Sequence, residues 1–185
     1  MKYYTGVGSR KTPKGVQAMM TDVANLLASV GWSLRSGGAH GADVAFEKGV
    51  CRHGLSSSEP PKMEIYLPWG GFNDRWEDGV GFYQLNHMNN DLQLKARNLV
   101  QEIHPAPYKL SKGACMLHMR NCFQVLGQDL NTPSNFLICW GETDSNAVPK
   151  GGTRTAWVLA EKYGIPCFNL YLEEHKKKLE NWLWK

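Results

Sequence analysis

Three times in this chain, a short apolar segment runs into a glycine-rich turn that is followed at once by a helical pattern. The turns lie at residues 6–10, 36–43 and 151–154. A strand, a turn and a helix in succession form the repeating unit of a parallel sheet whose crossover helices cover its faces. Because the ends of parallel strands meet at one edge of such a sheet, we expect the three turns to face one crevice.

The spacing of apolar residues predicts where the strands and helices lie. We expect strands near residues 2–7, 32–35, 63–67, 135–140 and 165–172. Helices are expected at 16–30, from 44 to about 49, at 91–103, at 111–126, between the turn at 151–153 and Gly164, and in the tail near 173–185. The predicted fold class is α/β: a Rossmann-like, doubly wound, mainly parallel sheet of about five strands flanked by helices.

One segment, residues 68–90, is rich in glycine and aromatic residues and shows no clean period. We expect an inserted loop there, either a functional lid or a short irregular helix, within a single domain that spans residues 1–185. Aromatic side chains can stack on a base, so Trp69, Phe72 and Trp76 are base-stacking candidates. The same side chains could instead form a minor core or an oligomer contact.

Composition excludes several classes of protein. The chain has 185 residues, of which 42% are hydrophobic and 21% charged, as in ordinary globular domains. No segment is long and apolar enough to span a membrane, and the first residues lack a signal-peptide pattern. Five cysteines, an odd number, fit reduced thiols. We therefore expect a cytoplasmic protein, in the host cytoplasm if its origin is viral, with no membrane partner.

The net charge and the spacing of possible metal-ligating residues limit which ligands the protein can bind. The net charge of +4 suits an anionic ligand and is below that of a dedicated nucleic-acid-binding protein. Cys115, His118 and Cys122 fall on one side of a predicted helix, but no fourth ligand accompanies them. We therefore expect these three side chains to pack in the core, and we expect no metal site.

The turns carry the chemistry of an anion site. Unpaired N–H groups in the first turn of a helix and the helix dipole both favour a phosphate or carboxylate. Arg10, Arg120 and Arg154 can each donate two hydrogen bonds to a phosphate, although Arg154 fits a solvated surface position equally well. Asp43 opens a helix, where it can cap the N-terminus, bind a ribose hydroxyl or activate water.

Four of these elements together resemble a known superfamily. They are Gly6-Val7-Gly8-Ser9-Arg10, Ser36-Gly37-Gly38-Ala39-His40-Gly41-Ala42-Asp43, Arg120-Asn121 and Gly151-Gly152-Thr153. In this order, over roughly residues 3–170, they resemble the Smf/DprA–LOG (SLOG) superfamily, and most closely its DprA-like branch, the Rossmann-like domain of DNA-processing protein A. The resemblance implies a Rossmann-like fold that binds nucleotides, nucleotide sugars or nucleic-acid phosphates at the strand ends.

Members of this superfamily have several different activities, and the motifs of this chain match the branches to different extents. The LOG branch hydrolyses the N-glycosidic bond of nucleoside monophosphates with a Gly-Gly-x-Gly-Thr-x-x-Glu element. Here Arg154 replaces the third glycine and Val158 replaces the glutamate, so we expect binding without turnover. If the protein is an enzyme, it is an N-glycosidic hydrolase acting on nucleotides, with Asp43, Glu142 or Asp144 as the general base. DprA itself binds single-stranded DNA, which is the third alternative.

The expected function is binding of a phosphorylated nucleotide derivative, either an NAD- or ADP-ribose-type molecule or a nucleoside monophosphate, by a sensor or sequestering protein. No cofactor is required beyond this nucleotide-type ligand. We also expect a homo-oligomer, with Trp182 and Trp184 in a contact between copies. The residues expected to bind the ligand or its phosphate are Gly8, Ser9, Arg10, Ser36, Gly37, Gly38, Gly41, Ala42, Asp43, Arg120, Asn121, Gly151, Gly152, Thr153 and Arg154.

Overall fold

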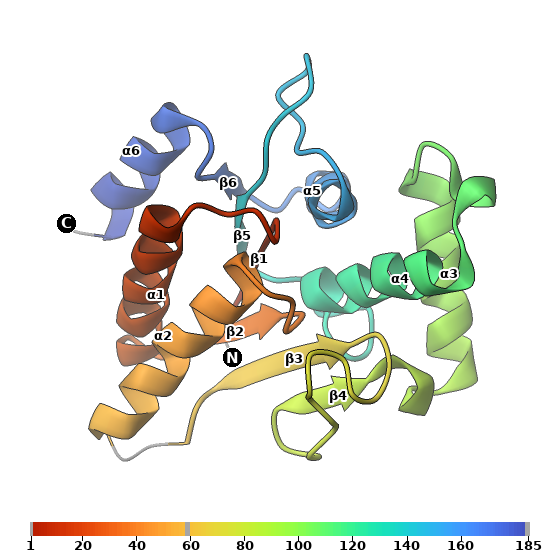
Figure 1. The fold of residues 1–185 in the computed structure, drawn as a ribbon, viewed down its shortest axis with the longest axis horizontal. Coiled ribbons are helices and arrows are strands. Elements are labelled where there is room, and N and C mark those ends of the chain that lie inside the picture. Colours follow the sequence, from red (N-terminus) through yellow and green to blue (C-terminus); the bar gives the residue numbers. More distant parts are fainter. Residues whose placement is uncertain (1, 58–59, 184–185) are drawn as a thin grey trace.

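A single twisted sheet runs through the middle of the protein (Figure 1). The computed structural model describes residues 2–57 and 60–183. In this part of the chain the sheet has six strands in the order β4-β3-β2-β1-β5-β6, and each neighbouring pair is parallel. The strands are β1 (Lys2–Gly8), β2 (Trp32–Ser36), β3 (Met63–Leu67), β4 (Phe82–Gln84), β5 (Phe136–Trp140) and β6 (Cys167–Asn169).

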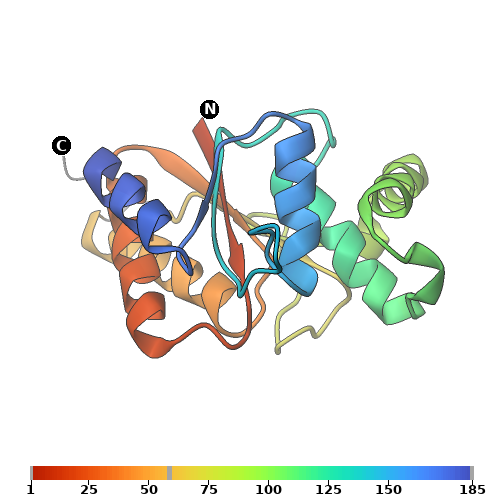
Figure 2. The same cartoon turned by 90° about the horizontal axis from the view of Figure 1, so that it is seen from above.

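Helices cover both faces of the sheet, as Figure 2 shows from above. The helices are α1 (Lys14–Ser29), α2 (Ala42–Ser57), α3 (Asn90–Ile103), α4 (Lys112–Leu126), α5 (Gly152–Lys162) and α6 (Glu173–Leu183), with short 3-10 turns η1 (Leu85–His87) and η2 (Pro107–Lys109). The α1, α2 and α6 helices pack on one face, and α3, α4 and α5 on the other. The predicted doubly wound α/β fold is therefore confirmed.

Side chains of the central strands alternate between two hydrophobic cores. In β5, Phe136 and Ile138 enter the core beneath α1 and α2, whereas Leu137 and Cys139 enter the core beneath α4 and α5. All five residues of this strand are buried, as expected for a parallel strand covered on both faces. The order of the strands reverses at β1, which lies between β2 and β5, and ligands bind at such switch points in open α/β sheets.

The second helix is longer than predicted. We expected it to end near Gly49, but α2 continues to Ser57. A Cβ at residue 49 would lie 2.2 Å from the carbonyl oxygen of Thr21 in α1. Gly49 therefore allows α1 and α2 to cross closely and does not end the helix.

The segment 68–90 contains a strand that the sequence did not predict. Its residues 82–84 form β4, which pairs with β3 at the edge of the sheet and is followed by η1. The expectation of a lid or irregular helix was therefore wrong for residues 82–84, whereas η1 is a short helix of the expected kind within the segment. A strand of three residues shows too few alternations to be seen in a hydrophobic pattern, and only its pairing with β3 reveals it.

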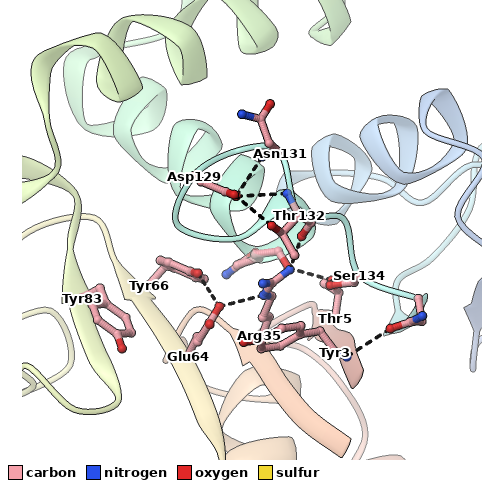
Figure 3. A network of polar contacts seen from close by, with 12 residues as sticks. Tyr3, Thr5, Arg35, Glu64, Tyr66, Tyr83, Asp129, Asn131, Thr132 and Ser134 are labelled. Atoms are coloured by element: carbon pink, nitrogen blue, oxygen red, sulfur yellow. Dashed lines mark hydrogen bonds and ion pairs between the residues drawn. The ribbon is translucent and has the colours of Figure 1, made fainter. Parts of the chain in front are cut away.

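A polar cluster fastens the sheet to the α4–β5 loop (Figure 3). Arg35 on β2 donates from Nε to Glu64 on β3 at 2.7 Å and from Nη1 to the carbonyl oxygen of Thr132. Tyr66 donates its hydroxyl hydrogen to the same Glu64 carboxylate at 2.6 Å. The guanidinium carbon of Arg35 also lies 3.8 Å from the centre of the Tyr3 ring. This cluster joins three strands, β1, β2 and β3, to a loop.

The C-terminal helix predicted near 173–185 is observed as α6. Trp182 packs edge-to-face on Phe136, with ring centres 5.0 Å apart, and is still 49% exposed. Its role in a contact between copies stays a prediction, and Trp184 lies outside the described residues. Within residues 2–57 and 60–183, no helix has the length and apolar character needed to cross a membrane.

Candidate functional site

A cleft of about 410 Å³ opens where β1 ends. It is bounded by the β1–α1 turn, the start of α2, one side of α4 and the start of α5. Nine of the predicted ligand-binding residues line it: Gly8, Ser9, Arg10, Asp43, Arg120, Asn121, Gly151, Gly152 and Thr153. Its volume lies within the range of small-molecule sites, roughly 300–1,000 Å³. As expected from their places in the chain, all three glycine-rich turns contribute to this one cleft.

The first and second turns touch through a glycine. Gly41 has φ of +86°, and a Cβ there would lie 2.6 Å from the carbonyl oxygen of Ser9. Only glycine suits both the backbone conformation and this close approach. The Ser9 hydroxyl accepts a hydrogen bond from the Lys11 N–H at 3.1 Å and does not cap a helix. Packing of the turns leaves Arg10 and Lys11 exposed at the rim of the cleft.

Contacts within the protein occupy the first residues of the second turn. The Ser36 hydroxyl donates to the carbonyl oxygen of Gly6 at 2.6 Å. The Gly38 carbonyl oxygen accepts from Asn73 Nδ2 at 2.7 Å and from Arg75 Nη1 at 3.0 Å. These groups maintain the shape of the turn and do not line the cleft.

Arg120 and Asn121 on α4 connect the turns. Arg120 donates from Nη1 to the Gly37 carbonyl oxygen at 2.9 Å and from Nη2 to Asn121 Oδ1 at 3.2 Å. Asn121 donates from Nδ2 to the carbonyl oxygen of Gly152 at the start of α5 at 2.8 Å. In the orientation its neighbours require, the Gln124 carboxamide also accepts from the Gly37 N–H at 3.0 Å. The Arg-Asn pair therefore fixes the second turn relative to α5.

Asp43 is a buried carboxylate at the floor of the cleft. Its side chain is 2% exposed, accepts from the Ala39 N–H at 3.2 Å and lies 3.9 Å from Arg120 Nη2. Burial raises the pKa of Asp43 to about 6, although Arg120 and backbone N–H groups counteract part of the rise. A carboxyl group with such a pKa in a cleft can accept a hydrogen bond from a hydroxyl or take a proton near neutral pH.

The start of α5 presents backbone to the cleft. Gly151 caps this helix with φ of +66° and without a side-chain hydrogen bond. A Cβ built at Gly151 or Gly152 would meet nothing within 4 Å, so no other segment crowds these two glycines, and both line the cleft. No acidic residue occupies the first turn of α5. The positive end of the α5 dipole thus faces the cleft without an internal counter-charge.

Basic side chains surround the entrance. Arg10, Lys11 and Lys150 are exposed and line the cleft. Among the lining residues in the described part of the chain, Asp43 is the one carboxylate. The entrance is therefore positive and the floor acidic, which suits a ligand with a phosphate and a hydroxyl-bearing sugar.

Several predicted site residues lie outside the lining. Asp144 accepts from Arg154 Nη1 at 2.9 Å and from the N–H groups of Asn146 and Val148, which together lower the pKa of Asp144. The two charges therefore pair with each other beside the cleft. The predicted residues that do not line the cleft are Ser36, Gly37, Gly38, Gly41, Ala42, Glu142, Asp144, Arg154, Trp69, Phe72 and Trp76.

The three aromatic candidates for base stacking are not equivalent. Phe72 is buried in the core beneath α2, and its ring lies 5.7 Å from the Arg120 guanidinium carbon. Trp69 packs edge-to-face on Phe72 with ring centres 5.4 Å apart, and Trp76 is 61% exposed. For Phe72 the structure favours the alternative of a core contact.

Nine residues that line the cleft were not among the predicted site residues: Val7, Lys11, Ala39, Ala114, Leu117, His118, Gln124, Lys150 and Ala156. A signal existed on α4, where Leu117, Asn121 and Gln124 recur at helical spacing on the same face. His118 contacts Thr155 Oγ1 on α5 at 2.6 Å, and burial lowers the pKa of His118 to about 4, which leaves it neutral.

Comparisons with known proteins identify the fold. No protein-family model and no curated protein sequence matches the chain. It is similar to DNA processing protein A from Helicobacter pylori, a structure described for its single-stranded DNA binding mode, with a TM-score of 0.55 and 17% identity over 97% of this chain and 72% of that chain. It is also similar to the molybdenum cofactor carrier protein of Chlamydomonas reinhardtii, with a TM-score of 0.50 and 16% identity over 98% of this chain and 85% of that chain. All three share the Rossmann-like α/β fold.

Proposed function

We propose that the protein binds a phosphorylated nucleotide derivative in the cleft at the end of β1. The observation that carries this proposal is the open start of α5, which faces the same cleft as exposed Arg10, Lys11 and Lys150. A helix N-terminus and several cations around one space form a phosphate site. Membership of the SLOG superfamily, which the motifs resemble, would agree with this assignment.

The other parts of the cleft suit the other parts of a nucleotide. Asp43 on the floor can accept hydrogen bonds from ribose hydroxyls. Val7, Ala114 and Leu117 supply an apolar wall for a base. An NAD- or ADP-ribose-type molecule and a nucleoside monophosphate both contain this combination of groups.

Mass spectrometry tests the proposal directly. The purified protein is denatured, and the released small molecules are identified; the native protein is then titrated by calorimetry with AMP, ADP-ribose and NAD. We expect at least one nucleotide to be released intact or to bind. Absence of any bound nucleotide in both measurements would overturn the proposal.

Substitution of two matched lysines tests where the phosphate binds. Lys150 precedes α5 and lines the cleft, whereas Lys162 lies at the opposite end of the same helix and pairs with Glu102. We expect Lys150→Ala to weaken nucleotide binding about tenfold, because a hydrogen bond to a charged group contributes roughly 1.5–3 kcal/mol. Lys162→Ala should leave the affinity unchanged. Equal effects of the two substitutions would place the phosphate elsewhere.

A second candidate function is N-glycosidic hydrolysis of the bound nucleotide. The position of Asp43 favours it, because a buried carboxyl group with a raised pKa beside a ligand site is a typical general base. In that case Asp43→Asn would abolish release of free base while the nucleotide still binds. Intact nucleotide after prolonged incubation with the native protein would rule out hydrolysis.

Single-stranded DNA is the third candidate, supported by the fold shared with the Helicobacter protein and by the positive rim. Binding of an oligonucleotide would weaken steeply as salt rises, because phosphate contacts release counterions. A titration with a thymidine oligonucleotide at two salt concentrations distinguishes this case. Tight AMP or NAD binding together with no oligonucleotide binding would exclude it.

A further inference from the structure

A second cavity, of about 710 Å³, lies on the other side of α4. Residues 114, 117, 118, 120, 121 and 124 of α4 line the cleft at the end of β1, whereas residues 112, 115, 116 and 119 line this second cavity. The helix α4 therefore separates the two spaces. Residues of α3 and α4 line this cavity, and Figure 1 shows these two helices together at the end of the molecule away from α1 and α2.

The walls of this cavity come from several elements. Gln93, Arg97, Val100 and Gln101 recur at helical spacing and form one face of α3. Pro107 of η2 and the following Leu110 also line it, and Trp69 and Leu85 contribute from the segment between β3 and α3. The volume falls within the range of roughly 300–1,000 Å³ that small-molecule sites occupy.

The interior of the cavity is apolar and adaptable. Leu85, Val100 and Met119 are buried, while Met116 and Leu110 are partly buried beside them. Methionine side chains are flexible and polarizable, so they fit apolar bodies of varied shape and make favourable contacts with aromatic rings. Trp69, which is 38% exposed, adds an aromatic face. These side chains can accept a sizeable apolar group.

The charges in the lining have a single sign. Arg97 and Lys112 are exposed, and no aspartate or glutamate is among the residues that line the cavity. Lys112 occupies the first turn of α4, which carries no acidic residue, so its charge adds to the positive end of the helix dipole. Glu102, the nearest acid on α3 after Gln101, pairs with Lys162 and lines a different groove. An anion would be the complementary ligand.

We propose that this second cavity binds a small organic anion with an apolar body, such as an aromatic carboxylate or sulfonate. The apolar body would contact the methionines and Trp69, and the anionic group would lie beside Arg97 and Lys112. Because α4 separates the cavities, such a ligand would bind without displacing a nucleotide from the cleft.

A pair of probes with the same body and opposite charge tests the proposal. The full chain is titrated by calorimetry with 1-naphthalenesulfonate and, separately, with 1-naphthylmethylammonium. We expect the sulfonate to bind at least tenfold more tightly. Equal affinities would overturn the proposal, and so would binding of inorganic sulfate as tight as that of the naphthalene compound, since the apolar body would then contribute nothing.

Substitutions test where the naphthalenesulfonate probe binds. Arg97→Gln combined with Lys112→Gln should weaken naphthalenesulfonate binding about tenfold, and both side chains are exposed, so the fold should persist. Arg52→Gln is the matched control, because Arg52 is exposed on α2 on the opposite face of the sheet. If Arg10→Ala weakens sulfonate binding and the double substitution does not, the probe occupies the nucleotide cleft and the proposal is wrong.

Discussion

The cluster around Arg35 and the cluster around Arg120 both bury an arginine beside a carboxylate, but the two pairs differ in geometry. Arg35 Nε lies 2.7 Å from Glu64, and Tyr66 donates to the same carboxylate. The nearest Arg120 nitrogen lies 3.9 Å from Asp43, too far for a hydrogen bond. Arg120 instead donates to the carbonyl oxygen of Gly37.

This difference separates a structural pair from a candidate functional pair. The Glu64 carboxylate has its partners within the protein and does not line the cleft. The Asp43 carboxylate faces the cleft and its charge is poorly compensated, which is why burial raises its pKa. A charge that the fold leaves under-compensated costs stability and remains available to a ligand. Removing the negative charge should therefore lower the stability of the fold at Glu64 and raise it at Asp43.

The largest effect is expected for Glu64→Gln, which leaves the Arg35 charge buried without its counter-ion. Loss of one partner of a buried pair typically lowers the free energy of unfolding by about 3–5 kcal/mol. Urea denaturation measures the change. Glu102→Gln is the control, because Glu102 pairs with Lys162 on the surface and such exposed pairs contribute about 0–1 kcal/mol. Similar losses for both variants would mean that the Arg35 cluster has no special structural role.

A smaller effect of opposite sign is expected for Asp43→Asn. The pKa of Asp43 is about 6 in the folded protein, compared with an ordinary value of 3.8. Its protonated form therefore stabilises the fold below about pH 4, and this contribution is lost as the pH rises through 6. At pH 7 the variant should be more stable than the native protein by up to ~3 kcal/mol, since one pKa unit corresponds to about 1.36 kcal/mol.

Urea denaturation at pH 4 and pH 7 checks this sign. The stability advantage of Asp43→Asn should be small at pH 4 and should grow toward pH 7. Asp22→Asn serves as the control, because Asp22 is exposed and pairs with Arg52. A variant that is less stable than the native protein at pH 7 would show that the ionised carboxylate of Asp43 is a structural group.

The smallest effect is expected for Arg154→Ala. Arg154 pairs with Asp144 beside the cleft, and both side chains are about one-third exposed. We expect no resolvable change in unfolding and a much weaker effect on nucleotide affinity than that of Arg10→Ala. Calorimetry on the two variants compares the arginines. An equal loss of affinity would mean that Arg154 leaves Asp144 to contact the ligand.

Much of the fold could be read from local sequence, with two exceptions. The apolar run of β5 and the helical spacing of apolar residues in α1 and α4 reflect burial. Burial of a segment is visible in the pattern of its own apolar residues. Gly49 was wrongly predicted to end its helix, because the reason for a glycine there is the close approach of Thr21 on another helix. The strand β4 was missed because three residues become a strand only through hydrogen bonds to β3.

By itself, the sequence determined that strands ending in glycine-rich turns would bring those turns to one edge of a parallel sheet. Only the tertiary structure decided which turn residues remain available to a ligand. The polar groups of Ser36, Gly37 and Gly38 bond to Gly6, Arg120, Asn73 and Arg75. At the start of α5 the Gly152 carbonyl oxygen is bonded to Asn121, but a Cβ at Gly151 or Gly152 would meet nothing within 4 Å. The availability of a polar group depends on partners far away in the chain, and no local pattern records them.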